Sequence, residues 1–134
     1  LLERHIKNDK TIIALVNFRN DSTYIPLTET RRILYNIKPP HFIELSKEEQ
    51  EKFTGDYKNA NGRIVKMIFE NGSLYKVTQE GDKSELKPVS KNKFLLLGFS
   101  PDVFYEFIVK DDKVEKYIMT QPEEKIERVL TRIQ

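Results

Sequence analysis

An Asn-Gly pair between two β-rich runs constrains the fold of this chain more than any other feature. Residues 63–70 and 73–79 are rich in β-branched, aromatic and alternating polar side chains, and Asn71-Gly72 lies between them. A type I′ turn needs positive φ at both central residues, and Asn followed by Gly adopts that conformation most readily. The stretch therefore predicts a β-hairpin whose two-residue loop sets the register. The expected cross-strand partners are Phe69 with Leu74, Ile68 with Tyr75, Lys66 with Val77 and Val65 with Thr78.

The alternation of a short strand and a turn continues to the C-terminus. Turn-forming residues stand at the breaks, for example Gly81-Asp82, Ser100-Pro101-Asp102 and Asp111-Asp112. Connections this short join antiparallel neighbours, because a parallel crossover needs a dozen residues or more. The sequence thus predicts a mainly β protein with an eight-stranded antiparallel up-and-down, lipocalin-like barrel, since closure removes exposed strand edges. The expected strands cover residues 53–59, 63–70, 73–79, 83–88, 93–99, 103–110, 113–121 and 124–133.

The region before the barrel predicts different elements. Residues 11–18 predict a buried strand, and residues 28–37 predict a helix that Pro39-Pro40 ends. Ser46 and Glu49 match a capping box that starts a second, short helix. We expect three parts: a strand and helix in residues 1–38, a linker in residues 39–45, and the barrel in residues 46–134.

The apolar side chains indicate how the barrel is filled and closed. Several strands carry apolar residues on both faces, so one face fills the interior and part of the other is covered. The expected interior residues are Val65, Met67, Phe69, Leu74, Phe94, Phe107 and Met119. For closure we expect Gly55 to allow a tight turn and Tyr57 to plug one end, with Arg128 or Arg132 over its ring as a cation–π contact.

Signals for chemistry are weak. The net charge of +2 without a block of like charges indicates no nucleic-acid surface, and the chain has no cysteine for a disulfide or thiolate metal site. The longest apolar run, residues 12–16, is too short to span a bilayer, and the first residues lack the apolar segment of a signal peptide. His5 and His41 stand in separate segments without carboxylates at ligand spacing.

A formal catalytic motif is also rejected. Ser84 and Lys87 match the Ser-x-x-Lys motif of serine β-lactamases, which works only on a helix. Here the motif falls on an expected strand, which points the two side chains to opposite faces. We therefore assign no catalytic, cofactor-binding or metal-binding residue to this sequence, and expect no cofactor.

The order of the motifs nevertheless resembles a known arrangement. Gly55-x-Tyr57, then Asn71-Gly72-x-Leu74, then Leu86-x-Pro88, a Phe-rich strand and a final Arg follow one another across residues 45–133. This order resembles the C-terminal lipocalin-like barrel, a domain of unknown function, that follows the catalytic domain in many serine β-lactamase-related hydrolases and peptidases. Residues 9–18 and 27–37 resemble the last core strand and the C-terminal helix of that catalytic domain.

The resemblance implies a function for the parent protein and for this part of it. The chain would be a non-catalytic accessory barrel that docks on or gates the upstream serine-hydrolase domain, or supports a homo-oligomer. The catalytic residues would lie upstream of Leu1, in a bacterial protein of the periplasm or cell envelope. The alternative is a barrel that binds a small hydrophobic ligand or lipid. True lipocalins carry a tryptophan where this chain has Tyr57, which argues against an open ligand cavity.

Overall fold

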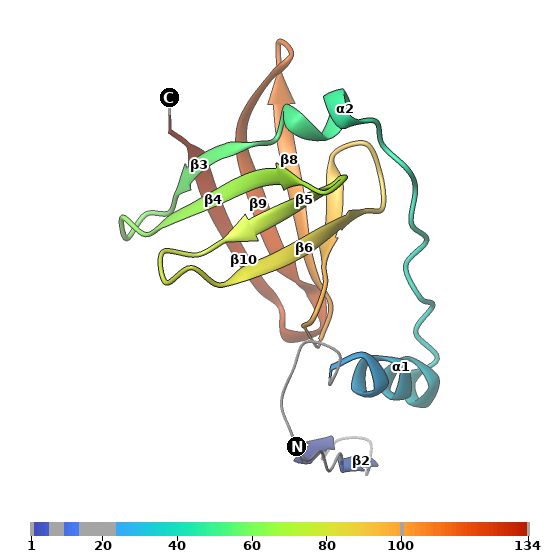
Figure 1. Cartoon of the computed structure of the whole chain (residues 1–134). Coiled ribbons are helices and arrows are strands. Elements are labelled where there is room, and N and C mark those ends of the chain that lie inside the picture. Colours follow the sequence, from blue (N-terminus) through green and yellow to red (C-terminus); the bar gives the residue numbers. More distant parts are fainter. Residues whose placement is uncertain (1, 6–9, 14–23, 100, 134) are drawn as a thin grey trace. The chain divides into compact units, whose positions relative to one another are not determined.

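The computed structural model describes residues 2–5, 10–13, 24–99 and 101–133. The chain forms two compact units (Figure 1). One unit comprises residues 1–39 together with residues 98–100, and the other comprises residues 40–97 and 101–134.

The first unit contains a small hairpin in place of the expected single strand. Strand β1 (Leu2–His5) pairs antiparallel with β2 (Lys10–Ile13). The predicted strand at residues 11–18 is confirmed for residues 11–13, which belong to β2, and its partner β1 was not predicted. Residues 14–18 of that prediction lie outside the described residues.

The helix of the first unit, α1 (Tyr24–Tyr35), starts and ends earlier than the predicted helix at residues 28–37. Pro26 lies in its first turn, where the missing N–H has no intrahelical acceptor in any case. The helix ends at Asn36, whose φ is 52°. The N–H of Ile37 donates to the Arg32 carbonyl and that of Asn36 to the Ile33 carbonyl, which is the Schellman arrangement. The double proline was expected to stop this helix, but Asn36 stops it first.

The second unit is a closed, eight-stranded, all-antiparallel barrel, as predicted. The strands follow one another in chain order, and β10 closes the barrel by pairing with β3. Its elements are α2 (Lys47–Glu51), β3 (Gly55–Lys58), β4 (Ile64–Glu70), β5 (Ser73–Val77), β6 (Lys83–Pro88), β7 (Lys93–Leu96), β8 (Val103–Lys110), β9 (Lys113–Gln121), the 3-10 helix η3 (Pro122–Glu124) and β10 (Ile126–Arg132).

The predicted hairpin forms with its predicted register. Asn71 and Gly72 have φ of 50° and 82°, both positive as a type I′ turn requires. Three expected pairs are confirmed: Phe69 with Leu74, Ile68 with Tyr75, and Lys66 with Val77. The fourth, Val65 with Thr78, was wrong, because β5 ends at Val77. The N–H of Thr78 instead donates to the Asp82 carbonyl, which starts the next turn.

Helix α2 has the predicted capping box and lies at one end of the barrel. The Ser46 hydroxyl accepts from the Glu49 N–H, and the Glu49 carboxylate accepts from the Ser46 N–H. Figure 1 shows α2 at the same end of the barrel as the β8–β9 turn, and the helix contacts β4 and β5. The chain then enters β3 at Gly55, two residues later than the predicted strand start at Phe53.

We expect Gly72→Ala to lower the free energy of unfolding by about 1–2 kcal/mol, because a Cβ is strained at positive φ. Open space surrounds this position, so the cost is conformational and not steric. Urea denaturation measures the loss. Gly72→Asn is the matched control and should lose less, since Asn tolerates the left-handed region. Equal losses in the two variants would contradict the conformational explanation.

Candidate functional site

Aromatic side chains fill the interior of the barrel. Five large rings are fully buried, with 0% of each exposed: Phe53, Tyr57, Phe94, Phe107 and Tyr117. They contact one another directly, with centroids 4.6 Å apart for Phe53 and Phe107 and 5.0 Å apart for Tyr57 and Tyr117. Tyr105 stacks on Tyr117 at 4.7 Å. The middle of the barrel is therefore occupied by protein.

The structure places the expected interior residues on the inward side of their strands. Five of them belong to the buried core, and Met119 packs against it. Phe69 is half-buried, opposite the fully buried Leu74. The sequence analysis did not include Phe53, Tyr105 or Tyr117 among the interior residues. Phe53 follows α2 directly, and its position after a capping box was the available signal. The five core members are Val65, Met67, Leu74, Phe94 and Phe107.

Two buried tyrosine hydroxyls differ in their hydrogen bonding. The Tyr57 hydroxyl donates to the Phe53 carbonyl at 2.8 Å, which joins the start of β3 to the end of the α2 turn. The Tyr117 hydroxyl has no hydrogen-bond partner among the described residues, although Tyr105 lies beside it. Burial raises the pKa of Tyr57 to about 12. Burial also raises the pKa of Tyr105 and of Tyr117, and the neighbouring tyrosines add to the effect at Tyr117.

Of the residues expected to close the barrel, the structure brings Gly55, Tyr57 and Arg132 together and places Arg128 further along β10. Arg132 is the partner of Tyr57 across the β10–β3 seam, and its Nη2 atom donates to the Thr54 carbonyl at 2.6 Å. The Arg132 guanidinium thus contacts backbone, where a cation–π contact with Tyr57 was expected. Gly55 has φ of 137°, and a Cβ there would lie 3.1 Å from the Arg132 Nε atom. Arg128 is exposed and lies opposite Met119 on β9.

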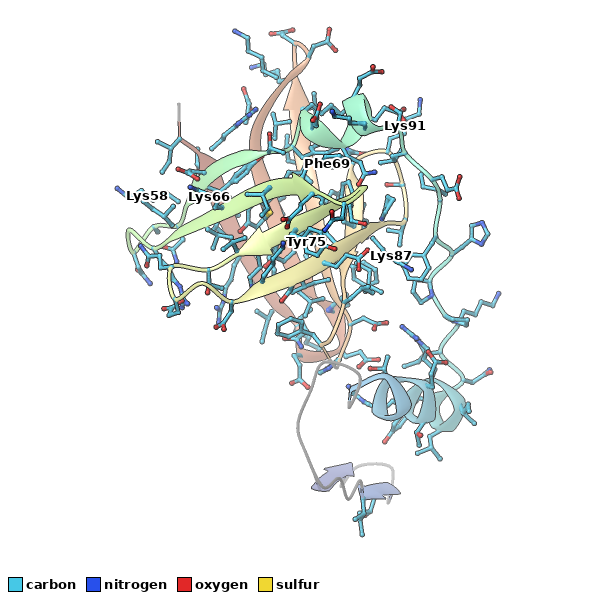
Figure 2. All side chains as sticks on the ribbon, viewed as in Figure 1. Lys58, Lys66, Phe69, Tyr75, Lys87 and Lys91 are labelled. Atoms are coloured by element: carbon cyan, nitrogen blue, oxygen red, sulfur yellow. The ribbon has the colours of Figure 1, made fainter. Side chains whose placement is uncertain are left out.

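The outward face of β3–β6 carries lysines and carboxylates in pairs. Figure 2 shows Lys66, Tyr75 and Lys87 on three of these strands. Lys66 lies 4.0 Å from Asp56, and Lys83 forms an ion pair with Glu70 while its ammonium also lies over the Tyr75 ring.

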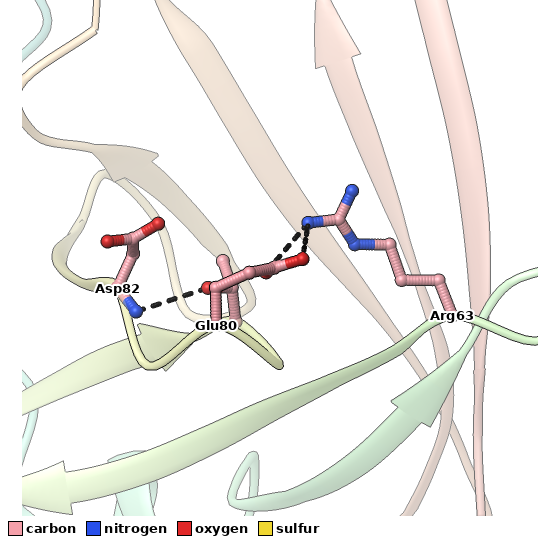
Figure 3. Close-up of polar contacts among 4 residues, drawn as sticks. Arg63, Glu80 and Asp82 are labelled. Carbon is pink, nitrogen blue, oxygen red and sulfur yellow. Dashed lines mark hydrogen bonds and ion pairs between the residues drawn. The ribbon is translucent and has the colours of Figure 1, made fainter.

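An arginine links two turns at one end of the barrel (Figure 3). Arg63, after the β3–β4 turn, pairs with Glu80 in the β5–β6 turn at 3.0 Å. Hydrogen bonds from its own backbone N–H and from the Thr78 hydroxyl hold the pKa of Glu80 below its usual value, and Arg63 adds to this. Lys76 lies on the inward side of β5, between Met67 and Ser84, and burial lowers its pKa.

A groove of about 470 Å³ lies on the outside of the barrel. It lies between β6 and residues 39–45, the linker that precedes α2, which is called the connector below. A backbone hydrogen bond holds the connector there, because the Ile43 N–H donates to the Pro88 carbonyl at 3.0 Å. Strand β5 starts only at Ser73, so it does not reach far enough to pair with Pro88. The groove has apolar and polar walls. They are formed by Phe42, Ile43, Glu44, Leu45, Gln50, Gly72, Ser73, Glu85, Leu86, Lys87 and Pro88.

Three hydrogen bonds fix polar side chains of this groove. Gln50 is only 6% exposed, and its Nε2 atom donates to the Leu45 and Gly72 carbonyls at 3.1 and 3.4 Å. The amide therefore ties the connector to the β4–β5 turn. The Ser73 hydroxyl donates to the Glu85 carboxylate at 2.9 Å. This groove was not predicted from the sequence, because residues 39–45 were expected to be a linker and not part of a groove.

Within the described residues, no cluster of three or more His, Asp or Glu side chains could hold a metal ion. His41 is exposed. No helix in the part of the chain that the structure describes is long and apolar enough to cross a membrane.

Comparison with known proteins gives no assignment. No family model, curated protein or solved structure matches the chain.

We expect Arg132→Ala to lower the free energy of unfolding by about 1.5–3 kcal/mol, because the variant loses a charged hydrogen bond and leaves the Thr54 carbonyl unpaired. Arg128→Ala is the matched control from the same strand. Its side chain is exposed, so we expect a change within about 0.5 kcal/mol. Thermal or urea unfolding measures both, and similar losses would contradict the role given to Arg132.

We expect Tyr57→Phe and Tyr117→Phe to change stability in different directions. Tyr57→Phe should lose about 0.5–1.5 kcal/mol, since it removes the bond to the Phe53 carbonyl. Tyr117→Phe should be neutral or stabilising, because it removes a buried hydroxyl without a partner. Urea denaturation at neutral pH measures both variants.

The Tyr57→Phe variant also tests the raised pKa of Tyr57. Unfolded tyrosines lose their proton near pH 10, whereas folded Tyr57 keeps its proton up to a pKa of about 12. The unfolded state therefore binds fewer protons in this window, and stability falls as pH rises from 10 to 12. The fall should be shallower in Tyr57→Phe. An unchanged slope in that variant would contradict the assignment.

Proposed function

We propose that the barrel is a non-catalytic accessory module that binds through its outer surface. The observation that carries this proposal is the filled interior, in which five aromatic side chains have no exposed area. A ligand carrier of this fold needs an interior with room for one small molecule. Here the same space holds side chains in contact with one another, which leaves the outer surface for recognition.

The partner follows from the order of the sequence motifs. The sequence of Gly55-x-Tyr57, Asn71-Gly72-x-Leu74 and Leu86-x-Pro88 supports a barrel that accompanies a serine hydrolase of the β-lactamase type. The parent protein would carry its nucleophile upstream of Leu1, in the periplasm or cell envelope. The barrel would then shape access to that active site or support an oligomer.

The structure gives such a module two suitable properties. The closed strand order leaves no free sheet edge in the barrel, which limits unwanted strand pairing. The rings pack closely in the interior, which holds the strands from which the outer side chains project. A rigid outer surface favours docking, because little conformational freedom is lost on binding.

We expect the chain to hydrolyse neither a chromogenic ester nor a β-lactam, and to show no saturable binding of a fluorescent fatty acid. The parent gene is expected to encode a helix-borne Ser-x-x-Lys element upstream of Leu1. Steady-state hydrolysis assays, a fluorescence titration and the upstream sequence check the three expectations.

For each of these expectations, one outcome would contradict it. Hydrolysis abolished by Ser84→Ala would make the chain an enzyme. Stoichiometric fatty-acid binding that Phe107→Trp weakens would assign a ligand to the interior and favour the carrier. An upstream sequence without the Ser-x-x-Lys element would remove the proposed partner.

A further inference from the structure

The carboxylates on the outward face of β3–β6 follow a rule with one exception. Asp56 and Glu70 each have a basic partner, namely Lys66 and Lys83. Glu85 has none among the described residues, and its hydrogen bond there comes from the neutral Ser73 hydroxyl.

Burial makes this exception costly. Glu85 is half-buried in the wall of the groove, whereas Glu106, Glu115 and Glu127 on the outward face of the other strands are exposed to water. Removing an ionised carboxylate from water is unfavourable unless a charge or several hydrogen bonds compensate it. The Ser73 hydroxyl occupies one oxygen and orients the group, which leaves the other oxygen for a donor from outside the chain.

A second acceptor faces the same space. Gln50 uses its Nε2 atom for the Leu45 and Gly72 carbonyls, so its Oε1 atom is fixed by these bonds. No hydrogen bond to that Oε1 atom is formed by any described residue, and Gln50 is one of the residues that line the groove. A buried amide held in this way presents a preformed acceptor.

The cation that lines the groove is already engaged. The Lys87 ammonium lies 5.2 Å from the centroid of the Phe42 ring, and that ring is still 40% exposed. Lys87 follows Glu85 on the same face of β6, yet it forms no ion pair with it among the described contacts. The remaining walls contain both polar and apolar side chains, with Ile43, Leu45 and Leu86 among the apolar ones.

We propose that this groove binds a small organic ammonium compound with an apolar body. The ammonium donates to the Glu85 carboxylate and the Gln50 Oε1 atom, and the apolar body lies along the Phe42 side of the groove. The volume of about 470 Å³ falls within the range of small-ligand sites. This binding goes beyond the proposed accessory function and does not depend on the partner domain.

The test is a nuclear magnetic resonance titration of the whole chain at pH 7 with three probes of one shape. These probes are phenethylammonium, neutral 2-phenylethanol and anionic phenylacetate. We expect phenethylammonium to bind with a Kd on the order of 1 mM and the other two to bind more weakly. The shifted backbone amides should be confined to residues 42–45, 50, 72–73 and 85–87.

Two variants should change the affinity in opposite directions. Glu85→Gln keeps the size of the side chain and its bond to Ser73, and should weaken binding about tenfold through the lost charge. Lys87→Gln removes a competing cation from the Phe42 ring and should tighten binding about threefold. Glu106→Gln, on the outward face of β8, is the matched control and should leave the affinity unchanged. The amide spectra show whether each variant is folded.

Four outcomes would overturn the proposal. They are no shift at about 10 mM phenethylammonium, equal binding of phenylacetate, shifts outside the groove, or an affinity that Glu85→Gln leaves unchanged. A lysine-bearing peptide that shifts these amides while the free amine does not would assign the groove to a protein partner instead.

Discussion

The barrel depends on the seam between its first and last strands. Only two registered pairs, Thr131 with Lys58 and Arg132 with Tyr57, join β10 to β3, whereas six join β10 to β9. One further backbone bond, from the Ile133 N–H to the Asp56 carbonyl, extends the seam at 2.8 Å. So few main-chain contacts need side-chain support. Arg132 supplies it by donating to the Thr54 carbonyl across the seam, and the Tyr57 hydroxyl holds the Phe53 carbonyl on the β3 side.

The filled interior and the outer groove are two results of the same arrangement. Phe53, just after helix α2, is fully buried in the barrel interior, while the connector before the helix is bonded to the end of β6. Because β5 starts only at Ser73, the Pro88 carbonyl lacks a strand partner and takes the Ile43 N–H. The space between the connector and the β4–β5 turn is the groove. The connector covers the end of β6, and the groove is the concave surface that results.

The sequence predicted the elements whose causes are local. Asn71-Gly72 and the capping box of Ser46 and Glu49 gave the turn, the register and the short helix, since each rests on the chemistry of neighbouring residues. The predicted start and end of α1 were wrong. Pro26 was not recognised as a residue of the first turn, and Asn36 was not recognised as the residue that stops the helix.

The candidate site could not be predicted in the same way. Its contacts join residues far apart in the chain, such as Gln50 with the Gly72 carbonyl and Arg132 with the Thr54 carbonyl. A backbone carbonyl leaves no mark on the sequence, so these partners appear only in the fold. Glu85 likewise looked like any surface carboxylate. Its lack of a basic partner becomes visible only in the folded structure, where the strand register shows which lysines pair with the other carboxylates.

The order of strands also determines how the barrel assembles. Each strand from β4 to β10 pairs with the one before it in the chain, and the β10–β3 seam alone joins distant segments. Bringing distant segments together costs chain entropy before any contact repays it, whereas hairpins form at little such cost. The entropic penalty of assembly is therefore concentrated in the closure of the β10–β3 seam, the joint with the fewest registered pairs in the barrel.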